Sequence, residues 1–404
     1  MEIEKLLNST LSLLEIDSLL NTDNLVDKKF VKYYPHLEVA VNLPYKNFER
    51  FTENLNTLYV ENTLISKRFS REKIFKFLET LISDKKAKQE NFSNEEAKIL
   101  FKDFEEQPSR DKYIIAPISG IRLDTSDKIT ISVFEIGKTS LLKNSTFKDT
   151  EYYIAVKINQ IYDEILAAEE AKNKFIDFAR LIAFISGQED KKIHIKIGLP
   201  VYPSYSHDLI YISTDAYNFL DEMNQSFPNT KLHNLNAEKI PVDNKFFYDN
   251  PNFKRIWYLY ENQSKNSKLE QRILNSCIAI GESMLSKSIK NSIIYTSMGY
   301  EILFSYDEGA LFQKSIGDKL ADMLGFLICK DKETRLRTIK SFKNFYSLRS
   351  SLVHGGDKQV DNSYQIFNQM LRAAIKELLH NDKFTQTTTI ENLYKLLKDA
   401  QNSY

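Results

Sequence analysis

Residues 332–356 read KETRLRTIKSFKNFYSLRSSLVHGG, and this stretch decides how we interpret the second part of the chain. Its apolar residues recur at helical spacing and two glycines follow, so we predict a helix over 332–354 that stops at the glycines. The predicted apolar face comprises Leu336, Ile339, Phe342, Phe345, Tyr346, Leu348, Leu352 and Val353. On an ideal helix, Arg349 falls inside this face and His354 lies at its edge, about 140° away.

A guanidinium on a packed face needs a carboxylate, a carbonyl or an anionic ligand, because burying an unpaired charge is prohibitive. Arg349 and His354 are five residues apart and do not share a helix face. Both groups can converge only if the helix ends near His354 or if a second helix contributes. A purely structural alternative pairs Arg349 with Glu301 or Glu282 and uses His354 to cap its own helix.

Proline marks the boundary between two parts of the chain. All nine prolines lie at or before Pro251, and none follows in this 404-residue sequence. Because proline breaks helix interiors, this asymmetry predicts an α+β domain over 1–245 and a C-terminal all-α helical bundle over 246–404.

The first part mixes helical and strand patterns. Apolar residues follow helical spacing at the start of the chain and again over 70–85, where Ser70 is the predicted N-cap. Residues Ser93–Glu96 match a capping box. Residues 112–213 are rich in strand patterns, with one long helix interrupting them, and the polar, aperiodic segment 229–250 is predicted as a linker. In the second part we predict helices over 252–264, 268–288, 290–305, 311–328, 332–354, 361–380 and 389–401.

Composition narrows the class of protein. Formal net charge is zero, but residues 251–360 hold 17 Lys and Arg against 11 Asp and Glu, a local surplus that suits an anionic partner. Cys277 and Cys329 form no CxxC pattern, and the histidines show no metal-ligand spacing, so we expect neither a metal nor another cofactor. The acidic start is unlike a signal peptide, and no apolar run is long enough to span a bilayer; we expect a soluble cytoplasmic protein.

The segment Tyr346–Gly355, YSLRSSLVHG, resembles the signature of HEPN domains, an arginine and a histidine separated by four residues near a helix end. It looks most like the ApeA-like branch, as does the upstream SMGYEILFSYDEGALFQKSIGDKLADML, a helix containing Glu301, then a loop and a second helix. The resemblance covers roughly residues 268–380. Gly356 stands where the branch that pairs with nucleotidyltransferases carries a tyrosine.

The resemblance implies a metal-independent endoribonuclease built on a homodimer, often a toxin in bacterial anti-phage defence. Attack by the RNA 2′-hydroxyl would use His354 for acid–base work, Arg349 on the phosphate, Ser350 in support and Glu301 as an orienter of the arginine. A two-fold axis would bring Arg349 of one copy near His354 of the other. The first domain would then sense a phage-derived trigger.

A basic approach to Arg349 gives the candidate RNA-binding residues Lys332, Arg335, Arg337, Lys340 and Lys343. These cations could equally form a solvated helix face. Two other functions stay open: a non-catalytic module that binds RNA or a nucleotide, and an interaction protein that uses the helical domain only to dimerise.

Overall fold

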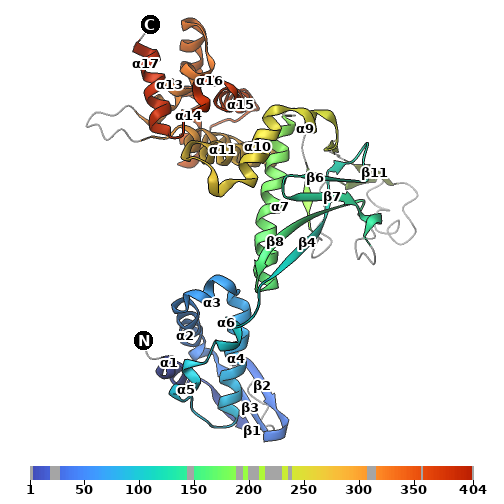
Figure 1. Cartoon of the computed structure of the whole chain (residues 1–404), viewed down its shortest axis with the longest axis vertical. Coiled ribbons are helices and arrows are strands. Elements are labelled where there is room, and N and C mark those ends of the chain that lie inside the picture. Colours follow the sequence, from blue (N-terminus) through green and yellow to red (C-terminus); the bar gives the residue numbers. More distant parts are fainter. Residues whose placement is uncertain are drawn as a thin grey trace. The chain divides into compact units, whose positions relative to one another are not determined.

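The computed structural model of the chain describes residues 3–18, 28–142, 150–187, 194–198, 209–213, 230–234, 239–306, 315–355 and 358–402. It confirms an α+β fold that ends in a run of helices (Figure 1). The chain forms two compact units: unit 1 holds residues 1–114 and 157–172, and unit 2 holds residues 115–156 and 173–404.

Unit 1 combines a small sheet with short helices. Its elements are α1 (Ile3–Leu11), β1 (Glu15–Ser18), β2 (Lys28–Tyr34), β3 (Val39–Pro44), α2 (Phe48–Glu61), α3 (Thr63–Arg68), α4 (Arg71–Ala87), α5 (Asn94–Lys98) and α6 (Lys102–Glu105). The three strands pair antiparallel in the order β1-β3-β2. Leu7, Leu43, Phe51 and Leu78 bury almost completely in one core between sheet and helices. The helical patterns of this region were predicted, but the sheet was not.

Two helix starts in unit 1 match the prediction. The Ser70 hydroxyl accepts the Lys73 amide of α4, and Ser93 forms a reciprocal capping box with Glu96 at the start of α5. Hydrogen bonds from the Lys85 side chain and the Ser93 backbone lower the pKa of the Glu96 carboxyl to about 2, against the opposing effect of burial. Both caps are therefore local features that sequence alone identifies.

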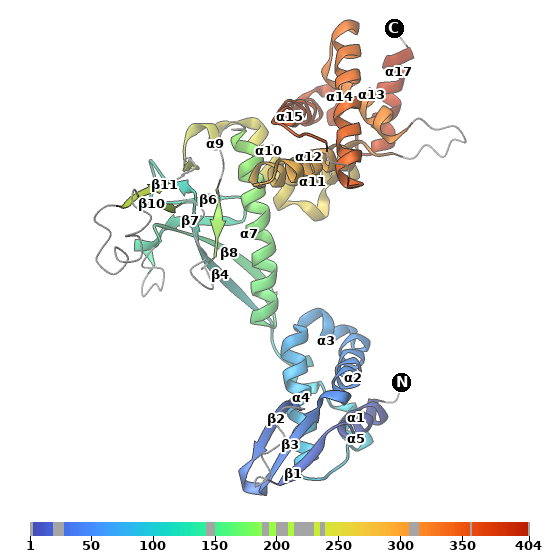
Figure 2. The ribbon, with the colours of Figure 1, turned by 180° about the vertical axis from the view of Figure 1, so that it is seen from behind.

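Unit 2 begins with a five-stranded sheet in the order β6-β7-β8-β4-β9. The strands and the helix beside them are β4 (Arg110–Ser119), β5 (Ile121–Arg122), β6 (Lys128–Ile131), β7 (Phe134–Lys138), β8 (Tyr152–Ile161), α7 (Glu164–Ser186) and β9 (Lys196–Ile197). Figures 1 and 2 show α7 lying along this sheet. The ring of Phe178 on α7 lies 4.9 Å from Phe134 on β7 and 5.8 Å from Trp257, so aromatic packing joins sheet and helices.

Two sequence predictions need correction in this region. Residues 128–137, with the sequence KITISVFEIG predicted as one strand, lie in the β6–β7 hairpin, whose turn places Ser132 at φ 55°, a backbone conformation that few non-glycine residues adopt. The predicted linker 229–250 contains β11 (Thr230–Asn234), β12 (Ile240–Pro241) and α9 (Lys245–Asp249). β11 pairs with β10 (Leu209–Ser213), and β12 runs parallel to β5.

The helical run follows the predicted spans closely. It comprises α10 (Pro251–Glu261), α11 (Lys268–Leu285), α12 (Ile289–Phe304), α13 (Ile316–Ile328), α14 (Lys332–Val353), α15 (Tyr364–His380), α16 (Asp382–Thr385) and α17 (Ile390–Asn402). Small residues let α11 and α12 approach closely: buried Ser283 donates to the Ser292 carbonyl at 2.8 Å, and Ser276 donates to the Gly299 carbonyl at 2.9 Å. Of the predicted helix 311–328, residues 311–314 lie outside the described part.

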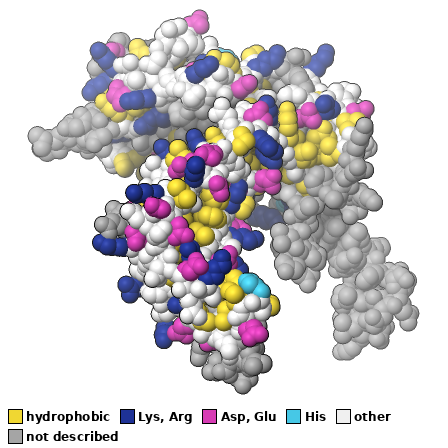
Figure 3. Space-filling view, turned by 60° about the horizontal axis from the view of Figure 1, so that its bottom comes forward, with side chains coloured by type: hydrophobic (Ala, Val, Ile, Leu, Met, Phe, Trp, Pro, Cys, Tyr) yellow, Lys and Arg dark blue, Asp and Glu magenta, His cyan; other side chains and the backbone are white. Residues whose placement is uncertain are grey.

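The compact units do not divide the chain at residue 245. Strands between residues 115 and 156 cluster with the helical run, while β4, β8 and α7 contribute residues to both units. Whether 246–404 folds by itself stays a prediction. In the described parts of the chain, no helix is long and apolar enough to cross a membrane. Figure 3 shows Lys and Arg side chains interspersed with Asp and Glu over one face, in keeping with the zero net charge.

Candidate functional site

Helix α14 carries the predicted motif, and both of its ends are defined by its sequence. The Asp331 carboxylate accepts the Thr334 amide at 2.8 Å and caps the first turn. His354 is the C-cap residue, and its backbone N–H donates to the Ser350 carbonyl at 3.2 Å. Gly355 follows with φ +78°, the left-handed conformation that ends helices and favours glycine. The predicted helix end at His354 is confirmed.

Aromatic packing holds α14 against its neighbours. Phe342 is fully buried, with its ring 4.6 Å from Tyr300 of α12, and Phe345 stacks on Phe367 of α15 at 4.3 Å. The apolar face is narrower than predicted, because Leu336 is 59% exposed and Val353 is 47% exposed. The described residues of this chain therefore leave Leu336 near the start of α14 and Val353 at its end largely uncovered.

Arg349 pairs with Glu301, the partner named both for the orienter role and for the purely structural alternative. Its Nη2 atom lies 3.0 Å from Oε1 and 3.2 Å from Oε2 of Glu301, which projects from α12. The exposed fractions of the two side chains are 22% and 26%, so the ion pair is half-buried and still reaches solvent. Glu282, the other carboxylate considered, binds Arg180 of α7 instead, at 2.5 Å.

The Arg349 guanidinium has unused hydrogen-bonding capacity. Its Nε atom is buried and has no hydrogen-bond partner among the described residues. A buried donor without a hydrogen-bond partner lowers the stability of a fold by on the order of 1–3 kcal/mol. The Nε–H of Arg349 is such a donor. An oxygen of an anionic ligand or of a second chain could supply the partner only if the side chains around this buried atom shift to admit the oxygen.

Tyr346 is part of the same constellation, although its helical spacing predicts only a place on the apolar face of α14. Its hydroxyl donates to Oε1 of Glu301 at 2.8 Å, and its ring centre lies 5.6 Å from the Arg349 guanidinium carbon. Burial, followed by the hydrogen bond to Glu301 and the charge of Glu301, raises the pKa of Tyr346 to about 12. The hydroxyl therefore stays a donor throughout the physiological pH range. The three-residue spacing from Arg349 could have signalled this role.

His354 and Ser350 lie one turn apart at the end of α14. His354 is exposed, and its imidazole has no hydrogen-bond or ion-pair partner in the described parts of the chain. Ser350 is half-buried, and its carbonyl accepts the C-cap N–H of His354. The imidazole is thus available to a ligand, while the structure brings Glu301 but not His354 into contact with Arg349.

The five candidate RNA-binding cations do not share one face of α14. Arg335 stacks on Phe326 at 4.3 Å, Arg337 pairs with Glu333 at 3.1 Å, and Lys343 pairs with Asp318 at 2.5 Å. Lys332 and Lys340 are exposed and have no ion-pair partner among the described residues. Three of the five cations are therefore already engaged within the chain.

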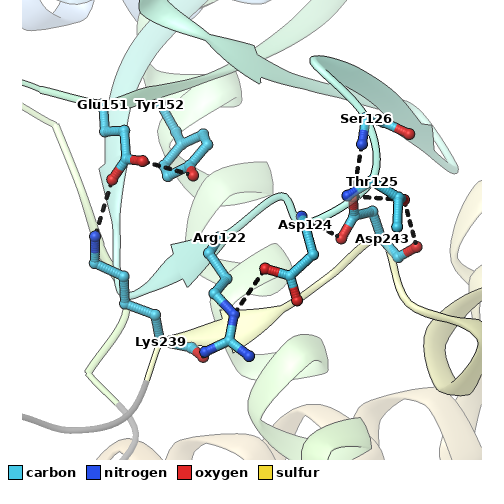
Figure 4. A network of polar contacts seen from close by, with 8 residues as sticks. All are labelled: Arg122, Asp124, Thr125, Ser126, Glu151, Tyr152, Lys239 and Asp243. Carbon is cyan, nitrogen blue, oxygen red and sulfur yellow. Dashed lines mark hydrogen bonds and ion pairs between the residues drawn. The ribbon is translucent and has the colours of Figure 1, made fainter.

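A second polar network in unit 2 was not predicted (Figure 4). The buried Asp243 carboxylate accepts the backbone N–H groups of Asp124, Thr125 and Ser126 at 2.6–3.0 Å, and also the Thr125 hydroxyl. It anchors the return of the chain at β12 to the turn after β5. Because more than a hundred residues separate the partners, no local pattern could reveal it.

Comparison of the chain with protein-family models, with curated proteins and with solved structures found no match.

Proposed function

We propose that this chain is a metal-independent endoribonuclease of the HEPN type. The observation that carries the proposal is the end of α14: Arg349 is held by Glu301, its Nε–H has no partner among the described residues, and His354 lies exposed at the same helix terminus. An arginine donor and a histidine proton acceptor are the two groups that RNA cleavage requires, since RNA carries its own nucleophile.

In the proposed reaction, the 2′-oxygen attacks the adjacent phosphorus and its proton passes to the His354 imidazole. The P–O5′ bond then breaks, and the departing 5′-oxygen takes a proton from an imidazolium or from water. Arg349 donates to the phosphoryl oxygens as negative charge grows on them. The products are a 2′,3′-cyclic phosphate and a 5′-hydroxyl, and no metal is needed for this proton balance.

The same proposal includes a homodimer. Arg349 and His354 do not share a helix face, so a second copy with the opposite orientation would supply the missing group to each site. Two exposed apolar side chains border the ion pair along their helices: Val353 is 47% exposed, and Met298 of α12 is 39% exposed. Burying such side chains against a second copy would contribute to association.

The remaining parts of the proposal come from the resemblance. Enzymes of this kind are often toxins of bacterial anti-phage defence, and the N-terminal part, residues 1–245, would sense a phage-derived trigger. Lys332 and Lys340, for which the described residues offer no ion-pair partner, would then contact the RNA backbone.

The test is RNA cleavage by the full chain in EDTA, compared with Arg349→Ala and His354→Ala. Loss of cleavage in both variants, with retention in the matched controls Arg50→Ala and His380→Ala, supports the enzyme. A substrate with 2′-deoxy sugars must resist cleavage, because it lacks the nucleophile. RNA binding without cleavage in every version would point to a binding module, and the absence of both to an interaction protein.

A further inference from the structure

Tyr346 makes more contacts within the candidate site than a packing residue needs. Its hydroxyl donates to Glu301 Oε1 at 2.8 Å, and the same oxygen lies 3.0 Å from Arg349 Nη2. The tyrosine and the arginine are therefore linked through one carboxylate oxygen. Fixing that carboxylate also fixes the direction in which the guanidinium presents its free Nε–H.

A glycine on a third helix makes room for the Tyr346 ring. A Cβ atom at Gly317, in the first turn of α13, would lie 2.7 Å from Cδ1 of Tyr346, closer than real Cβ contacts. The ring also stacks on Phe342, with ring centres 6.2 Å apart and planes inclined by 21°. Because both neighbours confine the ring, the hydroxyl has little freedom to leave Glu301.

We propose that Tyr346, seated against Gly317, is a positioning residue that sets the Arg349 guanidinium through Glu301. This role rests on the proposed function for its catalytic consequence, since it assumes that Arg349 binds the scissile phosphate. Tyr346 itself touches neither the phosphate nor the 2′-hydroxyl. Its contribution is to hold a flexible arginine in one orientation before substrate arrives, which lowers the cost of reaching the transition state.

The catalytic arm compares Tyr346→Phe and Gly317→Ala with wild type in RNA cleavage. We expect each change to lower kcat about tenfold while KM stays within about twofold, because orientation matters most in the transition state. The ratio of wild-type to Tyr346→Phe rates should stay constant from about pH 6 to pH 9, because the hydroxyl does not titrate in that range. Tyr295→Phe on α12 is the matched control and should leave kcat unchanged.

A second arm observes the arginine directly and needs no RNA. In ¹⁵N-arginine-labelled protein, the side-chain Nε–H signal of Arg349, assigned by its loss in Arg349→Lys, should exchange slowly with water. In Tyr346→Phe we expect this exchange to accelerate about tenfold, with unchanged thermal unfolding, because the orienting hydrogen bond is gone.

The two arms separate the two proposals. A wild-type protein that cleaves no RNA would refute the proposed function, and the exchange measurement would still decide whether Tyr346 positions Arg349. An unchanged Arg349 exchange rate in both Tyr346→Phe and Gly317→Ala would overturn the positioning role. An active enzyme whose kcat is insensitive to both changes would overturn it as well.

Discussion

Two polar networks in unit 2 use similar chemistry but differ in completeness. At Asp243, three backbone N–H groups and the Thr125 hydroxyl converge on a carboxylate that is 7% exposed. At Glu301, one arginine and one tyrosine share a carboxylate that is 26% exposed, and a buried N–H of the arginine finds no partner in the described parts of the chain. Where donors and acceptors are fully matched we expect stability to depend on the network; where a donor is left over, we expect a ligand.

The pKa of Asp243 shows how far a complete network outweighs burial. Burial alone would raise the pKa of this carboxyl, but the backbone hydrogen bonds of the turn and the Thr125 hydroxyl lower it below the ordinary value. No ion pair is needed for this effect, because hydrogen bonds to the charged form favour ionisation. The network therefore stabilises the fold in the ionised state.

The largest expected effect is on RNA cleavage, when the Glu301 network loses its arginine. Arg349→Ala removes the guanidinium that, in the proposed reaction, donates to the scissile phosphate, so we expect RNA cleavage to fall about a thousandfold. The Trp257 fluorescence transition in urea, which reports on unit 2 because this is the only tryptophan, should move little. If Arg349→Ala instead lost much stability and kept RNA cleavage, the Glu301 network would serve stability and not activity.

Stability should respond most at the complete network. Asp243→Asn replaces an acceptor of several N–H groups by an amide with one oxygen, and we expect the free energy of unfolding to fall by about 2–3 kcal/mol. Urea unfolding followed by Trp257 fluorescence measures this loss, with the exposed Asp382→Asn as control. RNA cleavage per folded molecule should not change.

The same variant has a predicted pH dependence. Because the folded pKa of Asp243 is lowered, its contribution is complete above the unfolded value near 4 and disappears as pH falls through the folded value. The stability difference between wild type and Asp243→Asn should thus be constant from about pH 6 to pH 8 and shrink below about pH 4. A difference that grows on acidification would contradict the ionised network.

Glu301→Gln should change RNA cleavage less than Arg349→Ala does. If Glu301 orients Arg349, the neutral amide should lower kcat about tenfold, because the guanidinium loses its charged partner. If the carboxylate instead competes with phosphate for the arginine, cleavage and RNA affinity should rise. Binding of a 2′-deoxy RNA analogue, measured alongside kcat, distinguishes an orienter from a competitor.

Sequence patterns predicted the parts of this molecule that depend on neighbours in the chain. The span of α14, its end at His354, the caps at Ser70 and Ser93, and the inward position of Arg349 all follow from periodicity or short motifs. Glu301 was named as a possible orienter, and the structure brings it within 3.0 Å of the arginine.

The missed features depend on contacts between distant segments. Tyr346 was read as one more apolar-face residue, and the need for glycine at position 317 exists only because that ring packs against α13. Asp243 lies in the segment predicted as a linker, and its partners lie in the turn after β5. Periodicity describes which side of a helix is buried, but it does not say which group from another element meets it.

The smallest effect is expected at a pair that is complete but exposed. Arg337 lies 3.1 Å from Glu333 on α14, with exposed side-chain fractions of 71% and 81%. Because water and salt screen such a pair, Arg337→Ala should change the midpoint of urea unfolding by no more than the error of the measurement. If this change instead destabilised unit 2 as much as Asp243→Asn, pairing alone would determine stability and burial would not. If Arg337→Ala abolished RNA cleavage as Arg349→Ala should, the Nε–H of Arg349 would no longer distinguish the catalytic arginine from other arginines of α14.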